Sequence, residues 1–226
     1  MIVTLIDFEK RTKEINLYFK HLQLLDIENA KIYLENRPRK KYFKANIELI
    51  KVLKANTFLL LYNLVESSIK QSITEIYDSI TNDNLTYDEV IDEIKKIYIK
   101  ENHASFKNLG IDNIFRTINS LSTEIIDIQF NSDKIISGNI DGRKVREFAA
   151  IYGFSDRSHI RANNGNKLHI VKLQRNNLAH GNVSFAECGR TYSTEEIEII
   201  KNEVILFLRS ILKNIDKFID SKKYKT

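Results

Sequence analysis

The stretch Thr57-Phe-Leu-Leu-Leu-Tyr-Asn-Leu-Val-Glu66 is apolar around nearly the whole circumference of a helix. It lies within a longer segment, from about Phe43 to Ile80, in which apolar residues recur every three or four positions. A helix that is hydrophobic on all sides is normally packed against several neighbours. We therefore expect residues 43–80 to form the central helix of the core.

Helical periodicity continues on both sides of this segment. Apolar residues from Leu5 to about Leu34 predict an amphipathic helix that ends before Pro38, because a proline disfavours helical dihedral angles in the residue before it. After the polar turn at residues 82–84, Thr86 is suited to cap a third helix that reaches about Ile99. These helices supply partners for the central one.

The C-terminal third predicts two further helices. The first runs from Lys167 to His180 and stops at Gly181, the residue type that most readily adopts the left-handed conformation after a helix. The second begins at Ser193 or Thr194, has glutamates near its positive end, and continues through Phe218. A loop from Asn182 to Tyr192 is expected to connect them, with Cys188 as part of the packing of this loop.

Between Lys100 and Asn166 the helical pattern weakens and turn signals multiply. Shorter helices are expected at Asn113 to Phe130 and at Gly142 to Tyr152. The chain contains only one Pro and seven Gly, so it lacks the turn residues that an all-β protein needs. The sequence thus predicts an all-α fold in which residues 1–226 form a single domain, with about 100–166 as an inserted, less regular segment.

Composition restricts the classes of protein to which the chain can belong. The longest apolar stretch, residues 58–65, is much shorter than the roughly 18 residues that a membrane helix needs, and the N-terminus lacks the features of a secretory signal. Cys188 is the only cysteine, so no intramolecular disulfide can form and a reducing compartment is suitable. We expect a cytoplasmic protein without a membrane helix.

A net charge of +5 and a pI near 9.1 are compatible with a polyanionic partner, although genomic base composition also explains a chain rich in Lys, Ile and Asn. Basic residues are interleaved with aromatic ones around positions 143–161, a mixture that suits phosphate contact and base stacking. Candidate RNA-binding residues are Arg143, Lys144, Arg146 and Lys172. The alternative interpretation is an ordinary helix surface over an aromatic core.

The segment Leu173-Gln-Arg-Asn-Asn-Leu-Ala-His-Gly-Asn182 is unusually polar for a core helix. Two successive Asn residues disfavour a helix interior, so the pattern calls for a functional reason. Asn176 and His180 lie on one helical face, where the amide can orient the imidazole. Arg175 lies about 140° and roughly 7.5 Å from His180 on an ideal helix. The two meet either if the last turn loosens or if two copies of the helix meet across a twofold axis.

These residue types suit RNA cleavage by the 2′-hydroxyl group of the substrate itself. A histidine, which ordinarily titrates near neutral pH, can take the proton from that hydroxyl or give one to the leaving 5′-oxygen. An arginine can bind the phosphate through its planar, permanently charged group. The reaction needs no metal ion and no cofactor.

The motif Arg175-Asn176-x-x-x-His180, continued by Gly181 and Asn182, resembles the hallmark of HEPN-domain ribonucleases. It is similar in particular to the bacterial HEPN subgroup associated with RiboL-PSP and toxin-type defence systems. The resemblance extends to residues 58–66, to Gly142-Arg-Lys-Val-Arg146 and to Tyr152-Gly-Phe154. It implies a HEPN-type helical bundle.

The resemblance also implies roles for residues and partners. Arg175 and His180 would be the catalytic pair of a metal-independent endoribonuclease, Asn176 a supporting residue, and a homodimer would assemble the cleft. A toxin or phage-defence effector, restrained by an antitoxin or another regulatory protein, is the implied role. Two alternatives remain: a catalytically inactive HEPN module that binds RNA or a nucleotide, and a structural helical scaffold.

Overall fold

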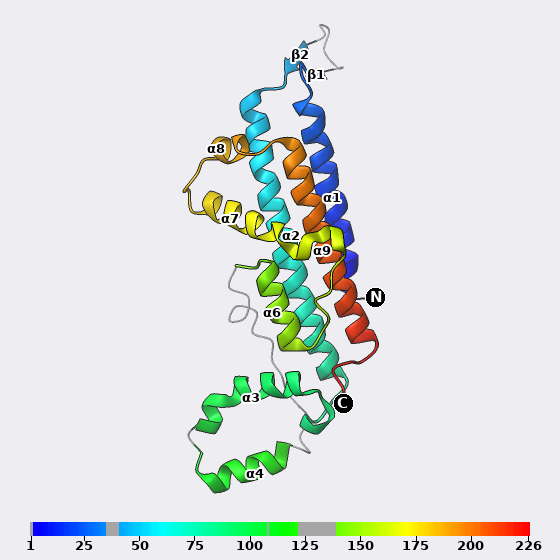
Figure 1. Cartoon of the computed structure of the whole chain (residues 1–226), viewed down its shortest axis with the longest axis vertical. Helices are drawn as coiled ribbons and strands as arrows, with labels where there is room; N and C mark the ends of the chain where they lie inside the picture. The colour runs from blue at the N-terminus through cyan, green and yellow to red at the C-terminus, as the bar shows by residue number, and fades with distance from the viewer. Residues whose placement is uncertain (1, 35–40, 108, 122–138) are drawn as a thin grey trace.

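Three long helices run along the molecule in the computed structural model, which describes residues 2–34, 41–107, 109–121 and 139–226. They are α1 (Val3–Asp26), α2 (Ile47–Asn82) and α9 (Thr194–Asp220), and each packs against the other two. Figure 1 shows them side by side along the long axis. This arrangement confirms the all-α prediction and the assignment of residues near 47–80 as the central helix.

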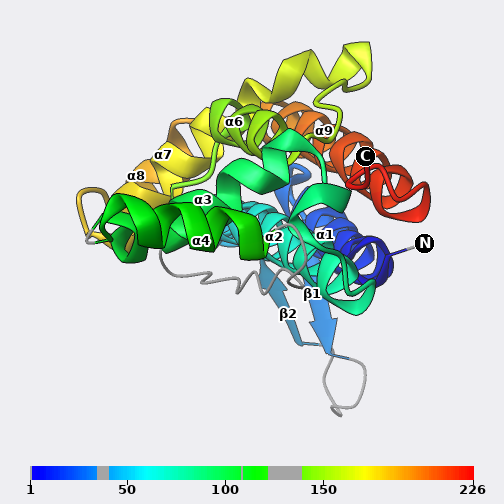
Figure 2. The same ribbon diagram turned by 90° about the horizontal axis from the view of Figure 1, so that it is seen from below.

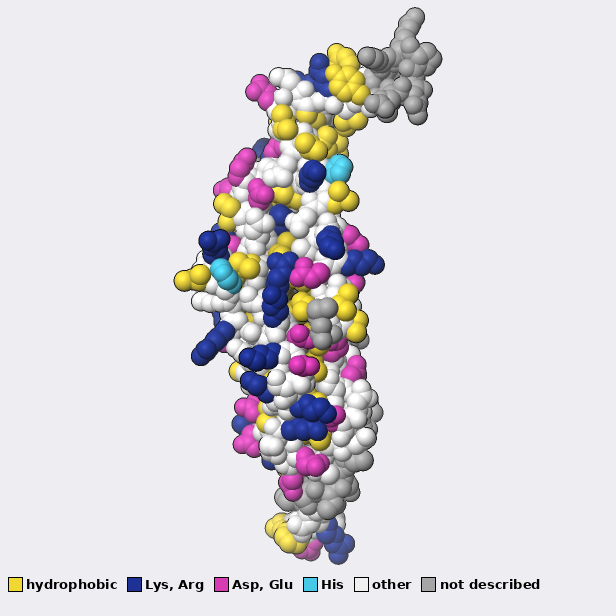
Figure 3. Space-filling view, turned by 90° about the vertical axis from the view of Figure 1, so that its right-hand side faces the viewer, with side chains coloured by type: hydrophobic (Ala, Val, Ile, Leu, Met, Phe, Trp, Pro, Cys, Tyr) yellow, Lys and Arg dark blue, Asp and Glu magenta, His cyan; other side chains and the backbone are white. Residues whose placement is uncertain are grey.

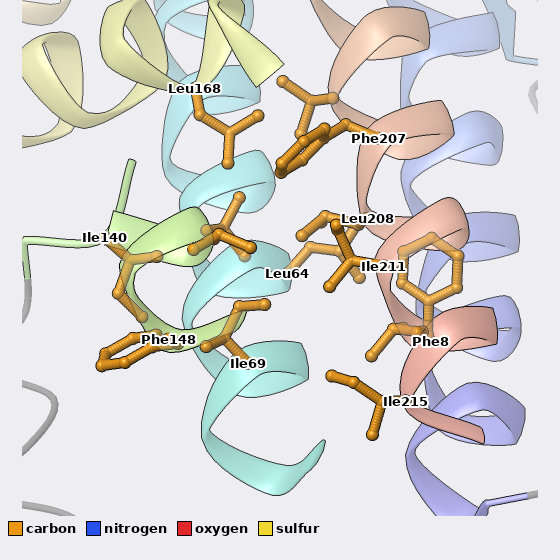
Figure 4. Packing of buried hydrophobic residues seen from close by; sticks show 14 of the residues in the cluster. Phe8, Leu64, Ile69, Ile140, Phe148, Leu168, Phe207, Leu208, Ile211 and Ile215 are labelled. Atoms are coloured by element: carbon orange, nitrogen blue, oxygen red, sulfur yellow. The ribbon is translucent and has the colours of Figure 1, made fainter. Parts of the chain in front are cut away.

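The hydrophobic core surrounds α2, as its apolar circumference predicts. Phe58, Leu61 and Leu64 are buried, whereas Asn63 points to solvent. Figure 4 shows side chains from α1, α2, α9 and the elements around Ile140 and Leu168 meeting in one region. The helices α7 (Lys167–Ala179) and α8 (Phe185–Arg190) also contact α2, so this helix is covered on several sides.

The connection between α1 and α2 differs from the prediction. Instead of helix up to Leu34 and from Phe43 onward, residues Lys31–Leu34 (β1) and Lys41–Lys44 (β2) form an antiparallel hairpin at one end of the bundle (Figure 1). Ile32 pairs with Phe43, and Tyr33 pairs with Tyr42. The predicted helix was wrong here because β-branched and aromatic residues pair well across strands and are weaker helix formers.

The middle of the chain contains η1 (Tyr87–Glu89), α3 (Asp92–Lys107), α4 (Ile111–Leu121) and α6 (Gly142–Tyr152). Thr86 does cap a helix, but a short 3-10 one, and α3 follows it and runs beyond Ile99. The prediction for α6 is confirmed at both ends. The helix expected at 113–130 corresponds to α4 as far as Leu121, and its remainder lies outside the described residues. Figure 2 shows α3 and α4 from the end of the bundle.

The last third of the chain places a short crosswise helix beside the bundle. After η2 (Ile160–Gly165), α7 (Lys167–Ala179) runs across the long axis and leads to α8 (Phe185–Arg190) and then α9 (Figure 1). Ser193 caps α9 in a capping box with Glu196, as predicted. Within the described part of the chain, no helix combines the length and apolar character that crossing a membrane requires.

Candidate active site at the end of α7

The C-terminal end of α7 forms the cap that the sequence predicts. Gly181 has a φ of +69°, a left-handed conformation that glycine adopts without a steric penalty. The Asn182 amide donates to the Asn177 carbonyl at 2.9 Å and the Gly181 amide donates to the Leu178 carbonyl at 3.3 Å, as in a Schellman motif. His180 occupies the capping position and its side chain is exposed.

Arg175 is held by contacts with two elements. One guanidinium nitrogen donates to the Oδ1 atom of Asn176 at 3.0 Å, and the guanidinium carbon lies 4.6 Å from the ring centre of Tyr62 on α2. Asn176 in turn donates from Nδ2 to the Oδ1 atom of Asn139 at 3.0 Å. A chain of contacts therefore joins α2, α7 and the segment that precedes α6.

Tyr62 lies buried beneath the Arg175 guanidinium. Its side chain is fully buried, and its hydroxyl accepts a hydrogen bond from the Ile140 amide at 3.3 Å. Burial raises the pKa of Tyr62, so the phenol stays neutral at physiological pH. A neutral aromatic face attracts a guanidinium through its quadrupole, and this attraction fixes where Arg175 can lie.

Arg175 and His180 occupy different surroundings within one chain. No hydrogen bond joins their side chains among the described residues, and His180 lies beyond the point where α7 ends. The Asn176 side chain contacts Arg175 and Asn139 in place of the imidazole that we expected it to orient. The physical reason is the cap at Gly181, which ends the regular helix at the residue before His180.

Lys172, one turn before Asn176, forms an ion pair with Asp141. Burial of Asp141 opposes its charged form, but hydrogen bonds from Lys172 and from the Lys144 amide outweigh this effect and lower the pKa of Asp141. Asp141 is also the N-cap of α6, where its Oδ1 atom accepts from the Lys144 amide. Lys172 thus connects α7 to the start of α6.

The other candidate RNA-binding residues lie on α6. The side chain of Arg143 is 80% exposed and lies 3.9 Å from Glu147, and that of Lys144 lies 3.0 Å from the same carboxylate. Arg146 donates to the Asn164 carbonyl at 2.6 Å. Arg143 and Arg146 line one cavity together with Lys172, whereas Lys144 does not line it.

Cys188 has a structural role and not a chemical one. Cys188 is buried on α8, its Sγ atom lies 3.5 Å from the Oε1 atom of Gln174, and burial raises the pKa of this thiol to about 11. Its packing role is therefore as expected, on a helix rather than in a loop. Among the residues that the structure describes, no group of three or more His, Cys, Asp or Glu side chains is placed to hold a metal ion.

Sequence reasoning missed Tyr62 and Asn139 as parts of the site. The signal for Tyr62 was a hydroxyl-bearing residue within a stretch of aliphatic side chains, which needs a polar partner when buried. Asn139 follows Gly138, and a Gly-Asn pair in the sequence indicates a turn rather than a site residue. Neither residue is near Arg175 in the sequence, so only the tertiary structure associates them with it.

Comparison with known proteins gives the family. Residues 4–224 match the family described as HEPN_MAE_28990-like HEPN, which confirms the resemblance to HEPN domains. Searches of curated proteins and of solved structures found no match. HEPN domains as a superfamily have nuclease-related and RNA-related roles. Because the match covers nearly all of a helical bundle with the expected motif at the end of α7, the chain belongs to the HEPN_MAE_28990-like HEPN family.

Proposed function

We propose that this protein is a metal-independent endoribonuclease in which Arg175 and His180 act on the same phosphodiester. The observation that carries the proposal is the contrast at the end of α7. Arg175 is held on Tyr62 by an ordered network, and His180 is presented to solvent directly after the helix ends. A fixed cation and an exposed imidazole are the two groups that a reaction needing charge stabilisation and proton transfer requires.

In the proposed reaction the 2′-hydroxyl oxygen attacks the adjacent phosphorus, and the bond to the 5′-oxygen breaks. One imidazole takes the 2′-hydroxyl proton, and a protonated group supplies the proton that the 5′-oxygen requires. Arg175 stabilises the negative charge that develops on the phosphoryl oxygens. The products are a 2′,3′-cyclic phosphate and a 5′-hydroxyl, so no water molecule is consumed.

We infer that two copies of the chain assemble the cleft. Within one chain Arg175 faces Tyr62 while His180 lies beyond the helix end, so a twofold arrangement of α7 is the simplest way to place an Arg and a His from different copies together. A mixture of the Arg175→Ala and His180→Ala variants tests this. If the site is shared, the mixed dimers regain one intact site and about a quarter of the wild-type activity returns. A site contained in one chain regains none.

Incubation of the purified protein with RNA in EDTA tests the activity itself. We expect cleavage that leaves cyclic phosphate ends, and we expect Arg175→Ala and His180→Ala each to lower the rate by at least a hundredfold. Exposed residues elsewhere supply matched controls: Arg190→Ala on α8 and His21→Ala on α1 should retain activity. Absence of cleavage by the wild-type protein, or full activity of either motif variant, would refute the proposal.

The alternative is an inactive HEPN module that binds RNA or a nucleotide. The existing contacts of Arg175 within the chain favour it, because a guanidinium already held by Tyr62 and Asn176 can serve binding alone. Such a module would shift RNA mobility without cutting. We extend the nuclease proposal to a toxin or phage-defence effector restrained by another protein; toxicity on expression, relieved by His180→Ala, supports that role.

A further inference from the structure

Two adjoining cavities lie beside the N-terminal part of α7. The first, about 360 Å³, is lined by Arg143, Arg146, His169 and Lys172, among others. The second, about 540 Å³, is lined by Arg157, Ser158 and Asn164, and again by Arg146. Arg146 and Asn166 line both cavities, so the two lie next to each other, and we call the pair the basic groove.

Gly142 and Gly165, which line the first cavity, are sites of close packing. A Cβ atom on Gly142 would lie 2.6 Å from the Gly165 carbonyl oxygen, and one on Gly165 would lie 2.9 Å from the Phe207 ring. The start of α6 can therefore approach the end of η2 because Gly142 lacks a side chain, and the end of η2 can approach Phe207 of α9 because Gly165 lacks one. This contact brings the arginines of α6 next to the residues that begin α7.

The charges along the groove are predominantly positive. Its lining includes Arg143, Arg146, Arg157 and Lys172 against two acids, Asp141 and Asp156, and His169 adds a titratable group. No ion pair involves Arg146 or Arg157 among the described residues. By contrast, the face of the molecule seen in Figure 3 intersperses basic and acidic side chains. The groove thus collects positive charge in a concave surface, where its effect on an anion is strongest.

The groove also contains a polar atom that lacks a partner. The Oγ atom of Ser158 is buried and makes no hydrogen bond with any described residue, although Ser158 lines the larger cavity. A buried hydroxyl without a partner costs free energy, so it is normally satisfied by a ligand or by solvent.

We propose that the basic groove binds the sugar-phosphate backbone of the RNA substrate and leads it to Arg175. The cations are distributed over two neighbouring cavities, which suits a chain of phosphates better than one isolated phosphate. Lys172 lies three residues before Arg175 on α7, about 4.5 Å along the helix axis, so the groove ends beside the proposed active site. This inference rests on the proposed function, because it takes RNA to be the ligand.

The test uses a short single-stranded RNA with 2′-O-methyl groups, which cannot be cleaved by 2′-hydroxyl attack. The double variant Arg143→Gln/Arg157→Gln removes two exposed charges from the groove, and Lys10→Gln/Lys20→Gln removes two exposed charges from α1 as a matched control. We expect the groove variant to weaken binding about tenfold and to reduce the slope of log K against log salt by about 1.4. The control should change neither quantity.

Arg143→Lys/Arg157→Lys retains the charges and should recover most of the affinity, which separates charge from side-chain shape. On cleavable RNA, the groove variant should raise KM more than it lowers kcat. The proposal that the groove binds RNA is wrong if the groove variant and the control variant weaken RNA binding equally, or if neither weakens it. A mononucleotide that competes as well as the oligonucleotide also overturns it. If the wild-type protein binds through the groove but never cleaves, the groove stands and the nuclease proposal fails.

Discussion

Arg175 shows how one residue of the motif depends on a distant one. Its guanidinium rests on Tyr62, whose ring is fully buried in the core helix α2. A side chain with as many rotatable bonds as arginine gains precision only when such contacts restrict it. The position of the proposed catalytic cation is therefore set by an aromatic residue that carries no reactive role of its own.

A double-mutant cycle on Tyr62 and Arg175 measures this dependence. We expect Tyr62→Leu and Arg175→Met to be coupled by about 1 kcal/mol in the free energy of unfolding by urea, because each removes the cation–π contact. Tyr62→Phe retains the aromatic face, so its coupling to Arg175→Met should be near zero. It should still lower stability by about 1 kcal/mol, because the Ile140 amide loses its acceptor.

The cycle needs a control for general destabilisation. Tyr62→Leu combined with Lys10→Met, an exposed change on α1, should be additive. A coupling to Arg175→Met no larger than in this control would show that Tyr62 does not hold the guanidinium. The measurement requires no RNA, so it is independent of the proposed activity.

At the scale of elements, sequence periodicity predicted the long helices well and the hairpin not at all. Apolar residues spaced three or four apart indicate that one face of a helix is buried, and the buried residues of α2 and α9 follow this spacing. The hairpin is only four residues long in each strand, and its Ile32, Tyr33, Tyr42 and Phe43 remain substantially exposed. The pairing of strands across a loop is a non-local property that a local helical pattern obscures.

For the candidate site, the sequence predicted the local features and not the tertiary contacts. The sequence located Arg175, Asn176 and His180 at a helix end that Gly181 terminates, because capping is a local effect. It did not predict that Asn176 would bind Asn139, or that Tyr62 would lie under Arg175. These contacts depend on how α2, α7 and the segment before α6 pack, and no local pattern encodes that packing.

Helix α8 packs directly against the backbone of α2. An ideal Cβ atom on Gly189 would lie 1.8 Å from the Lys51 carbonyl oxygen, so the two helices touch through their backbones. Gly189→Ala must displace α8 from α2, and we expect it to lower the free energy of unfolding by about 2 kcal/mol. The urea midpoint measures the loss. Gly110→Ala, where a Cβ would meet nothing within 4 Å, is the matched control and should stay within about 0.5 kcal/mol.

This substitution also bears on the site, because α8 follows the short loop after His180. A displaced α8 alters the path of that loop, so Gly189→Ala should reduce RNA cleavage even at temperatures where the protein remains folded. If the variant is as stable as the wild-type protein, α8 does not pack on α2 as closely as the structure indicates.

Across the whole molecule, the C-terminal residues close the fold by returning to the junction of α2 and α3. Asp83, the residue after α2, accepts hydrogen bonds from Lys222 and from the Tyr224 hydroxyl, both at 2.8 Å. The Ile91 amide donates to the Tyr224 carbonyl at 3.0 Å, and the Tyr224 side chain is buried. Residues separated by more than half of the chain are thereby joined around a single carboxylate.

That carboxylate makes stability depend on pH. Hydrogen bonds from Lys222, Tyr224 and Lys225 hold the pKa of Asp83 well below its ordinary value of 3.8. A carboxyl group whose pKa is lowered by folding stabilises the folded state above its unfolded pKa, and this contribution is lost as the pH falls through the folded value.

Asp83→Asn should therefore lower Tm at pH 7, and the difference from wild type should shrink progressively below about pH 3.8. Asp78→Asn, an exposed change on α2, serves as the control in the same thermal scans. If the difference in Tm between wild type and Asp83→Asn stays unchanged down to pH 2, the charge of Asp83 does not stabilise the packing of the C-terminal residues.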